Sequence, residues 1–173
     1  MRIAIVGAGI AGLACAHELE RLGVVCDVFE KRDRIGKMFR TVETMLQPLS
    51  MEPHRDIFTL LRGECQLPVN PANHIVRTVM HTRNREATLN GGLGYTTIRG
   101  YEERSLEMQL HRHITAEVQF DQDVDVRALM KSYDWVVLAA GSPAWPKQFG
   151  LWTKDICWWV AGANVKGDFN PAE

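Results

Sequence analysis

Three glycines near the N-terminus have the spacing of a phosphate-binding turn. Gly7, Gly9 and Gly12 form a Gly-x-Gly-x-x-Gly pattern. The first glycine permits a tight turn, the second lets the backbone approach a pyrophosphate, and the third lets a helix pack closely on a sheet. The pattern therefore predicts a dinucleotide-binding turn.

The turn needs a strand before it and a helix after it. An apolar run over residues 1–6 predicts a buried strand, and residues 10–22 predict a helix that ends at Gly23. The first amide groups of a helix have no partner within it, so Ile10 and Ala11 are candidate phosphate contacts at the positive end of the helix dipole.

Glu30 is the candidate ribose ligand. It follows a second predicted strand, residues 24–29, which completes a βαβ unit with a right-handed crossover. A carboxylate at this position accepts hydrogen bonds from both ribose hydroxyls and repels a 2′-phosphate, so NADP is disfavoured. NAD and FAD share this unit, and both remain open at this point.

The segment from Asp134 to Gly141 favours FAD. A buried, apolar core strand is predicted over residues 133–138 and ends in small residues, among them Ala140 and Gly141. Only small residues beside the first turn can approach a nucleotide without a clash. The segment resembles the ATG-type motif of the large FAD-dependent families, and this resemblance implies that Ala140 and Gly141 contact the cofactor.

Between these motifs the chain resembles the geranylgeranyl reductase and FixC branch of the para-hydroxybenzoate hydroxylase-like flavoproteins. The resemblance lies in residues 94–99, followed by a predicted helix over residues 102–113 with Leu106 and Leu110 at helical spacing. It implies that Arg99 starts a helix near the flavin and that Val124 contacts adenine through its backbone. A solvated arginine at a strand end is the alternative for Arg99. In intact members, reduced flavin would deliver a hydride to an activated double bond or pass electrons onward.

The segment after Glu30 is similar to that of related families, in which it commonly ends in a glycine pair. Here the second glycine is replaced by Lys37, so the path of the loop is open. Lys31 and Arg40 are candidate phosphate or flavin contacts, with solvated charges as the alternative. Residues 33–36 followed by Arg40 also resemble amine-oxidase-like flavoproteins, although the small-residue ending of residues 139–142 argues against that group.

The remaining pattern predicts a single α/β domain over residues 1–173. We expect a Rossmann-like FAD/NAD(P)-binding fold with a parallel central sheet and additional short β-strands. A plain NAD(P)-dependent dehydrogenase is disfavoured because regular βα units do not recur. The rest of the chain predicts an irregular basic segment at 31–47, a helix at 56–62, a strand at 75–81, a turn at 91–94, a strand at 95–99, and short extended pieces at 118–120 and 124–126.

The resemblance extends over only the first part of the family pattern, so the chain is expected to be truncated. Residues 150–173 are interpreted as a possible fragment of a substrate domain, with an apolar, Trp-rich run at 156–161 that a homo-oligomer or partner chain would cover. Gly167-Asp168 is too close to Gly141 to be the family's second Gly-Asp motif. No catalytic residue or substrate is assigned, and a non-catalytic dinucleotide-binding module that needs a partner chain is the alternative to an oxidoreductase.

Composition narrows the partners. The 173 residues carry 20 Lys or Arg and 21 Asp or Glu, a formal net charge of −1, which favours neither nucleic acid nor an anionic membrane. Four cysteines form no Cys-x-x-Cys pair, and His111 and His113 point in different directions on a helix. We therefore expect a cytoplasmic protein with reduced thiols and no metal site.

Overall fold

The computed structural model describes residues 1–37, 41–46 and 56–141. Arg40, the Trp-rich run, Gly167-Asp168 and the segment 150–173 lie outside the described residues. The elements are β1 (Ile3–Val6), α1 (Ile10–Arg21), β2 (Cys26–Phe29), β3 (Thr41–Leu46), α2 (Ile57–Gly63), β4 (Asn73–His81), β5 (Glu86–Arg99), α3 (Leu106–His111), β6 (Val118–Gln119), α4 (Val126–Ser132) and β7 (Trp135–Leu138).

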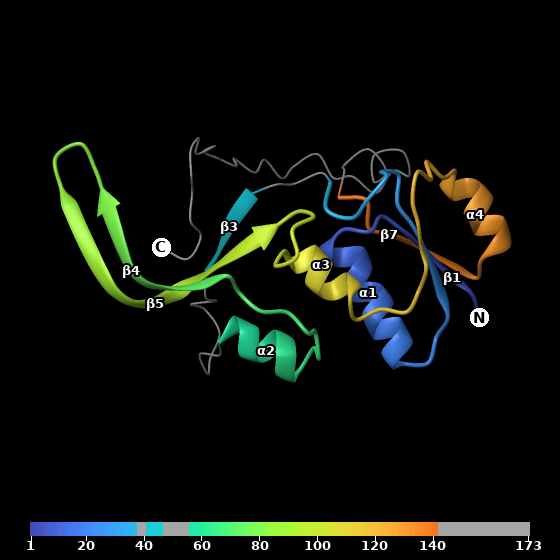
Figure 1. Ribbon diagram of the computed structural model, residues 1–173, viewed down its shortest axis with the longest axis horizontal. Helices are drawn as coiled ribbons and strands as arrows, with labels where there is room; N and C mark the ends of the chain where they lie inside the picture. Colours follow the sequence, from blue (N-terminus) through green and yellow to red (C-terminus); the bar gives the residue numbers. More distant parts are fainter. Residues whose placement is uncertain (38–40, 47–55, 142–173) are drawn as a thin grey trace, which may run out of the picture.

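A four-stranded parallel sheet has the order β6-β2-β1-β7, and Figure 1 shows it toward the end of the molecule that is opposite the β4–β5 hairpin. All four residues of β1 are buried, as expected for a strand with neighbours on both sides. Helix α1 connects β1 to the parallel strand β2, and Gly23 ends it in a left-handed conformation with φ of 72°. The predicted Rossmann-like α/β fold is confirmed.

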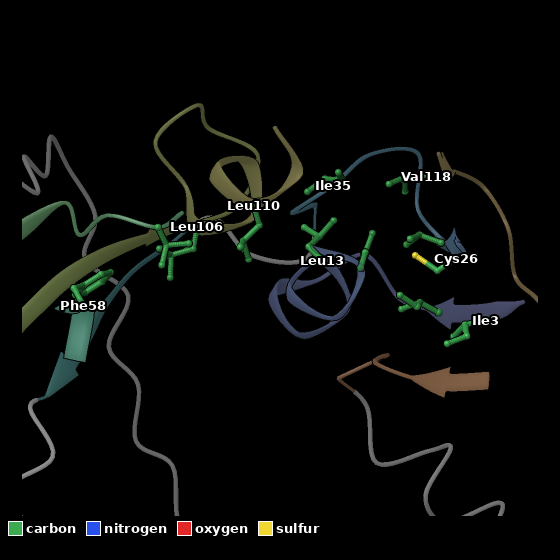
Figure 2. Packing of buried hydrophobic residues seen from close by; sticks show 13 residues of the cluster. Ile3, Leu13, Cys26, Ile35, Phe58, Leu106, Leu110 and Val118 are labelled. Carbon is green, nitrogen blue, oxygen red and sulfur yellow. The ribbon is translucent and has the colours of Figure 1, made fainter. Parts of the chain in front are cut away.

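The hydrophobic core lies where α1 packs on this sheet and α3 packs against α1 (Figure 1). Leu13 of α1 and Leu110 of α3 are almost completely buried, and Cys26 of β2 belongs to the same cluster. Figure 2 shows these side chains together with Ile35, from the loop after β2. The core therefore joins the βαβ unit to segments that are far away in the sequence.

Strand β7 lies beside β1 as expected, but it is not a core strand in the described part of the chain. It is the last strand of the sheet, and Trp135 is 66% exposed. The prediction of a buried strand was wrong on this point because an apolar run does not reveal whether its second edge and faces are covered.

A second, antiparallel sheet has the order β3-β5-β4. It corrects two expectations. Part of the irregular segment forms β3, which pairs with β5. The predicted turn at residues 91–94 lies inside β5, and the hairpin turn is made by residues 82–85, where the hydroxyl of Thr82 accepts a hydrogen bond from the Arg85 amide at 3.0 Å. Figure 1 shows this β4–β5 hairpin extending away from the rest of the molecule.

The helices also differ from the predicted pattern. Ser105 accepts a hydrogen bond from the Met108 amide and caps α3, so this helix is shorter than the predicted 102–113. The predicted extended piece at residues 124–126 is only partly present: Asp125 has extended backbone angles and caps α4, which already begins at Val126. The predicted helix at 56–62 is confirmed with a shift of one residue, capped by Asp56. No helix among the described residues has the length and apolar character needed to cross a membrane.

Candidate dinucleotide-binding site

The first glycine of the turn is required by two features of the fold. Gly7 has φ of 108°, a conformation that L side chains rarely adopt. A Cβ on Gly7 would also lie 2.6 Å from the carbonyl oxygen of Ala139, at the end of β7. The turn is therefore closed against the strand that carries the predicted small-residue motif.

Gly12 and Gly9 have different surroundings. A Cβ on Gly12 would overlap the carbonyl oxygen of Gly7, so the close packing of α1 on the turn requires glycine. A Cβ on Gly9 would meet nothing within 4 Å. Gly9 caps α1 with extended backbone angles, and its side chain position is open.

The N-terminus of α1 presents amide groups to this open space. The cap residue Gly9 has no side chain that could accept hydrogen bonds from these amides, and the first turn of α1 contains no acidic residue. Helix α1 begins at Ile10 and continues through Ala11 and Gly12, so the predicted phosphate contacts lie in its first turn. An anion bound here would accept hydrogen bonds from amides and gain from the helix dipole.

The carboxylate of Glu30 reaches the same turn. Glu30 directly follows β2 and is 9% exposed. Its Oε2 accepts a hydrogen bond from the Ala8 amide at 2.9 Å, and its Oε1 accepts one from the Arg32 amide at 3.0 Å. The structure thus brings the predicted ribose ligand and the glycine turn together, although Ala8 and Glu30 are 22 residues apart in the sequence.

The loop that precedes α4 lies beside Glu30. The Gln122 amide donates to the carbonyl oxygen of Glu30 at 2.9 Å, and Lys31 forms a 2.7 Å ion pair with Asp123. Val124, predicted to contact adenine, follows Asp123 in this loop. Both charged side chains of the ion pair are exposed, which fits the solvated alternative for Lys31.

The end of β7 completes the wall of the turn. The Ala139 amide donates to the carbonyl oxygen of Val6 at 2.8 Å, which continues the pairing of β7 with β1. A Cβ on Gly7 would also lie 3.1 Å from the Cα of Ala140. Gly141, the last described residue of this segment, has φ of 64°. The backbone of Ala139 and Ala140 therefore leaves no room for a side chain at Gly7.

Arg99 is held by two carboxylates in the described structure. Its Nε donates to Glu107 of α3 and its Nη1 donates to Glu43 of β3, both at 2.8 Å. Burial lowers the pKa of Arg99, but these hydrogen bonds outweigh it, and the net pKa is raised. Arg99 is 17% exposed, so the solvated alternative is wrong, while a contact with flavin stays a prediction.

Glu107 and Glu43 are the residues that sequence reasoning missed. Glu107 lies 8 residues after Arg99, within a segment predicted to be helical, and a charged residue on such a helix is ordinarily assigned to solvent. The β-branched residues Thr41, Val42 and Thr44 could have identified β3. Nothing in the sequence connects Glu43 to Arg99, 56 residues away.

The gathered residues form a candidate site for an anionic nucleotide. Amides, small residues and one carboxylate converge at the ends of β1, β2 and β7, the location where Rossmann folds bind ligands. The described residues contain no group of three or more His, Cys, Asp or Glu side chains able to hold a metal ion.

Comparison with known proteins is consistent with this geometry. Residues 5–57 match the family model described as an NAD(P)-binding Rossmann-like domain. The chain is 33% identical over 103 residues to the putative flavin-containing monoamine oxidase AofH of Mycobacterium tuberculosis, which is 57% of this chain and 23% of AofH. It is 40% identical over 62 residues to the putative oxidoreductase UacF of Escherichia coli, which is 35% of this chain and 10% of UacF. The matched segment thus spans less than a quarter of each of these relatives.

Among solved structures, a flavoprotein/dehydrogenase from Cytophaga hutchinsonii has a similar fold. The TM-score is 0.51 at 17% identity, and the similarity covers 87% of this chain and 42% of that protein. Together with the strand order and the closed glycine turn, these comparisons show that the chain contains a Rossmann-like domain of the FAD/NAD(P)-binding type.

Proposed function

We propose that the chain binds FAD and is the FAD-binding domain of a flavin-dependent oxidoreductase. The observation that carries the proposal is the Glu30 carboxylate, which contacts the Ala8 amide beside the open N-terminus of α1. This arrangement places a ribose ligand next to a pyrophosphate site, at the edge where parallel strands end.

The residues present fit the adenosine diphosphate half of FAD. The open space at Gly9 allows close approach of a pyrophosphate to the backbone. An ionised carboxylate offers about four acceptor positions, and the amides of Ala8 and Arg32 use two of them at Glu30. The remaining positions can accept the ribose hydroxyls. FAD, when bound, supplies the redox-active ring, whereas these residues bind and orient its nucleotide half.

The relatives support FAD over NAD. AofH is named as flavin-containing, and its match covers 103 residues, which is 57% of this chain. The small residues that follow β7, Ala139 and Ala140, lie against Gly7 and agree with the ATG-type motif that favoured FAD in the sequence. The finer proposal, a member of the geranylgeranyl reductase-like group, is supported by the sequence resemblance around Arg99.

An amine-oxidase-like flavoprotein is the second candidate, favoured by the similarity to AofH. The two candidates differ in what reduces the flavin. Anaerobic bleaching of the oxidised flavin by a primary amine would support the amine oxidase, and reduction only by another donor would support the reductase group. The residues that the structure describes include no identified substrate wall, and we propose that the reaction needs further residues, which a longer protein or a partner chain could supply.

The test of FAD binding is direct. The purified chain, supplied with FAD, should show a flavin absorption band at about 450 nm, and mass spectrometry of the released nucleotide should identify FAD. Release of NAD without flavin would contradict the proposal.

A pair of variants tests the assigned ligand. Glu30→Ala should weaken ADP binding about 10-fold or more, because it removes acceptors for the ribose hydroxyls. The matched control is Glu18→Ala, which removes an exposed carboxylate of α1 that is paired with Arg21. Equal ADP affinity of the two variants would contradict the assignment of Glu30 as the ribose ligand.

A further inference from the structure

Glu107 is the most deeply buried carboxylate among the described residues, and it fixes the backbone of Gly100. Glu107 is 1% exposed. Besides the ion pair with Arg99, its Oε2 accepts a hydrogen bond from the Gly100 amide at 3.1 Å. The carbonyl oxygen of Gly100 accepts a second hydrogen bond from the buried Ser105 hydroxyl at 2.7 Å. Both polar groups of this peptide position are therefore held by α3.

Gly100 in turn forms the surface on which the loop after Glu30 packs. Gly36, in this loop, has φ of 67°, and a Cβ on Gly36 would overlap the carbonyl oxygen of Gly100. Ile35 is 3% exposed in the core beside it, and the Arg34 guanidinium lies 5.6 Å from the centre of the Tyr101 ring. The loop of residues 31–37 therefore follows the position of Gly100 and Tyr101.

The same loop holds the candidate ribose ligand. The Arg32 amide donates to Oε1 of Glu30 at 3.0 Å, and the Arg32 carbonyl oxygen accepts from the Asp121 amide at 3.0 Å. The second oxygen of Glu30 accepts from Ala8 in the glycine turn. A continuous series of contacts thus runs from Glu107 through Gly100 and the loop to Glu30.

We propose that Glu107 is a positioning residue for the dinucleotide site: by fixing Gly100 it fixes loop 31–37, and through the loop it sets where the Glu30 carboxylate meets the ribose. The inference rests on the proposed function, because it takes Glu30 as the ribose ligand. Coupling through packed and hydrogen-bonded contacts of this kind commonly changes affinity by roughly 2- to 30-fold.

The readout is the discrimination between ADP and 2′,5′-ADP, measured by calorimetry on the full chain. A positioned Glu30 repels the 2′-phosphate, and 2′,5′-ADP carries only a 5′-monophosphate in place of the pyrophosphate, so the native chain should prefer ADP for both reasons. The change in this preference from the native chain to a variant therefore reports the position of Glu30. Glu107→Gln cannot accept both hydrogen bonds, because one of its oxygens becomes a donor group. We expect ADP binding about 3- to 10-fold weaker and a smaller preference over 2′,5′-ADP. A partly unfolded sample would weaken both ligands equally and leave their ratio unchanged.

Glu43→Gln is the matched control. It removes the other carboxylate that binds Arg99, but it has no contact with Gly100 among the hydrogen bonds of the described residues. Its ratio of ADP to 2′,5′-ADP affinity should equal that of the native chain. ADP is the probe because it lacks the flavin, so a change cannot arise from contact of Arg99 with the ring. A ratio lowered equally by both variants would overturn the proposal.

Gly36→Ala tests the same series of contacts from its other end and keeps Glu107 intact. The added methyl group must displace the loop from Gly100, so the preference for ADP should fall as it does in Glu107→Gln. If Glu107→Gln does not fold, Gly36→Ala decides alone. If each of these two variants that folds keeps the native ratio of ADP to 2′,5′-ADP affinity, the inference is overturned, but the proposed FAD binding is not. A native chain that binds neither ADP nor FAD would instead refute the proposed function, and the inference with it.

Discussion

Gly9→Ala separates what the fold requires from what the ligand requires. Gly9 has φ of −81° and ψ of −176°, which any residue can adopt, and its Cβ position has no neighbour within 4 Å. The protein alone therefore gives no reason for a glycine here. A pyrophosphate held by the first amides of α1 gives one, because a methyl group would occupy its place.

The two expected effects differ widely in size. Alanine is a poorer helix cap than glycine by about 0.5–1 kcal/mol, but it also lowers the entropy of the unfolded chain by a comparable 0.4–1 kcal/mol. The free energy of unfolding should therefore change by less than about 0.5 kcal/mol. Loss of one or two charge-assisted hydrogen bonds, each about 1.5–3 kcal/mol, should weaken FAD and ADP binding by roughly 10- to 100-fold or more.

The assay pairs urea denaturation, followed by circular dichroism, with calorimetric titration of ADP. Gly63→Ala is the matched control, because its Cβ position is also open but lies at the end of α2. Gly12→Ala is the contrasting case, since its methyl group would overlap Gly7, and overpacking should lower stability by about 1–3 kcal/mol. A Gly9→Ala chain that binds ADP within twofold of the native chain would refute the assignment of this helix end to the pyrophosphate.

Two further predictions concern the core and the second sheet. Burial, followed by the negative charge of Glu20, raises the pKa of the Cys26 thiol from 9.0 to about 11. As the pH rises, this thiol therefore ionises in the unfolded chain before it ionises in the folded chain. The free energy of unfolding should not depend on this group below pH 9 and should fall between about pH 9 and 11. Urea denaturation across this range checks it, and Cys26→Ala should show a shallower decline; the same slope in both chains would contradict it. Tyr95→Phe removes the hydroxyl that donates to Asp56 but keeps the ring packed at 4.9 Å on Phe58, so it should cost about 1–3 kcal/mol in urea denaturation. No loss of stability would mean that this hydrogen bond contributes nothing.

The glycine turn and Glu30 could be predicted because their signals are local. The spacing of the three glycines predicts the geometry of the turn, and the carboxylate follows the next strand at a fixed distance along the sequence. The pairing of β7 with β1 was also accessible, because small residues at the end of an apolar strand indicate close approach. In each case a short segment contains the physical reason for its own structure.

The second sheet could not be predicted because the contacts that determine it join residues that are far apart in the sequence. Gly91 and Gly92 indicate a turn by themselves, yet they lie within β5, where a Cβ on Gly92 would meet the His74 ring at 2.6 Å. The true turn contains no glycine and depends on the Thr82 hydroxyl. The hydrogen bonds of Arg99 with Glu107 and Glu43 likewise join residues from three elements, and no pattern in the sequence predicts these contacts.

The strand order β6-β2-β1-β7 has a consequence for synthesis of the chain on the ribosome. The βαβ unit of β1, α1 and β2 emerges first, but its two neighbours in the sheet come from residues 118–138. At about 5–20 residues per second, the 88 residues between β2 and β6, numbers 30–117, take roughly 4–18 s to be added. During that time both edges of the nascent nucleotide-binding unit are open to pairing with other chains, so early chaperone contact should concentrate on this N-terminal unit.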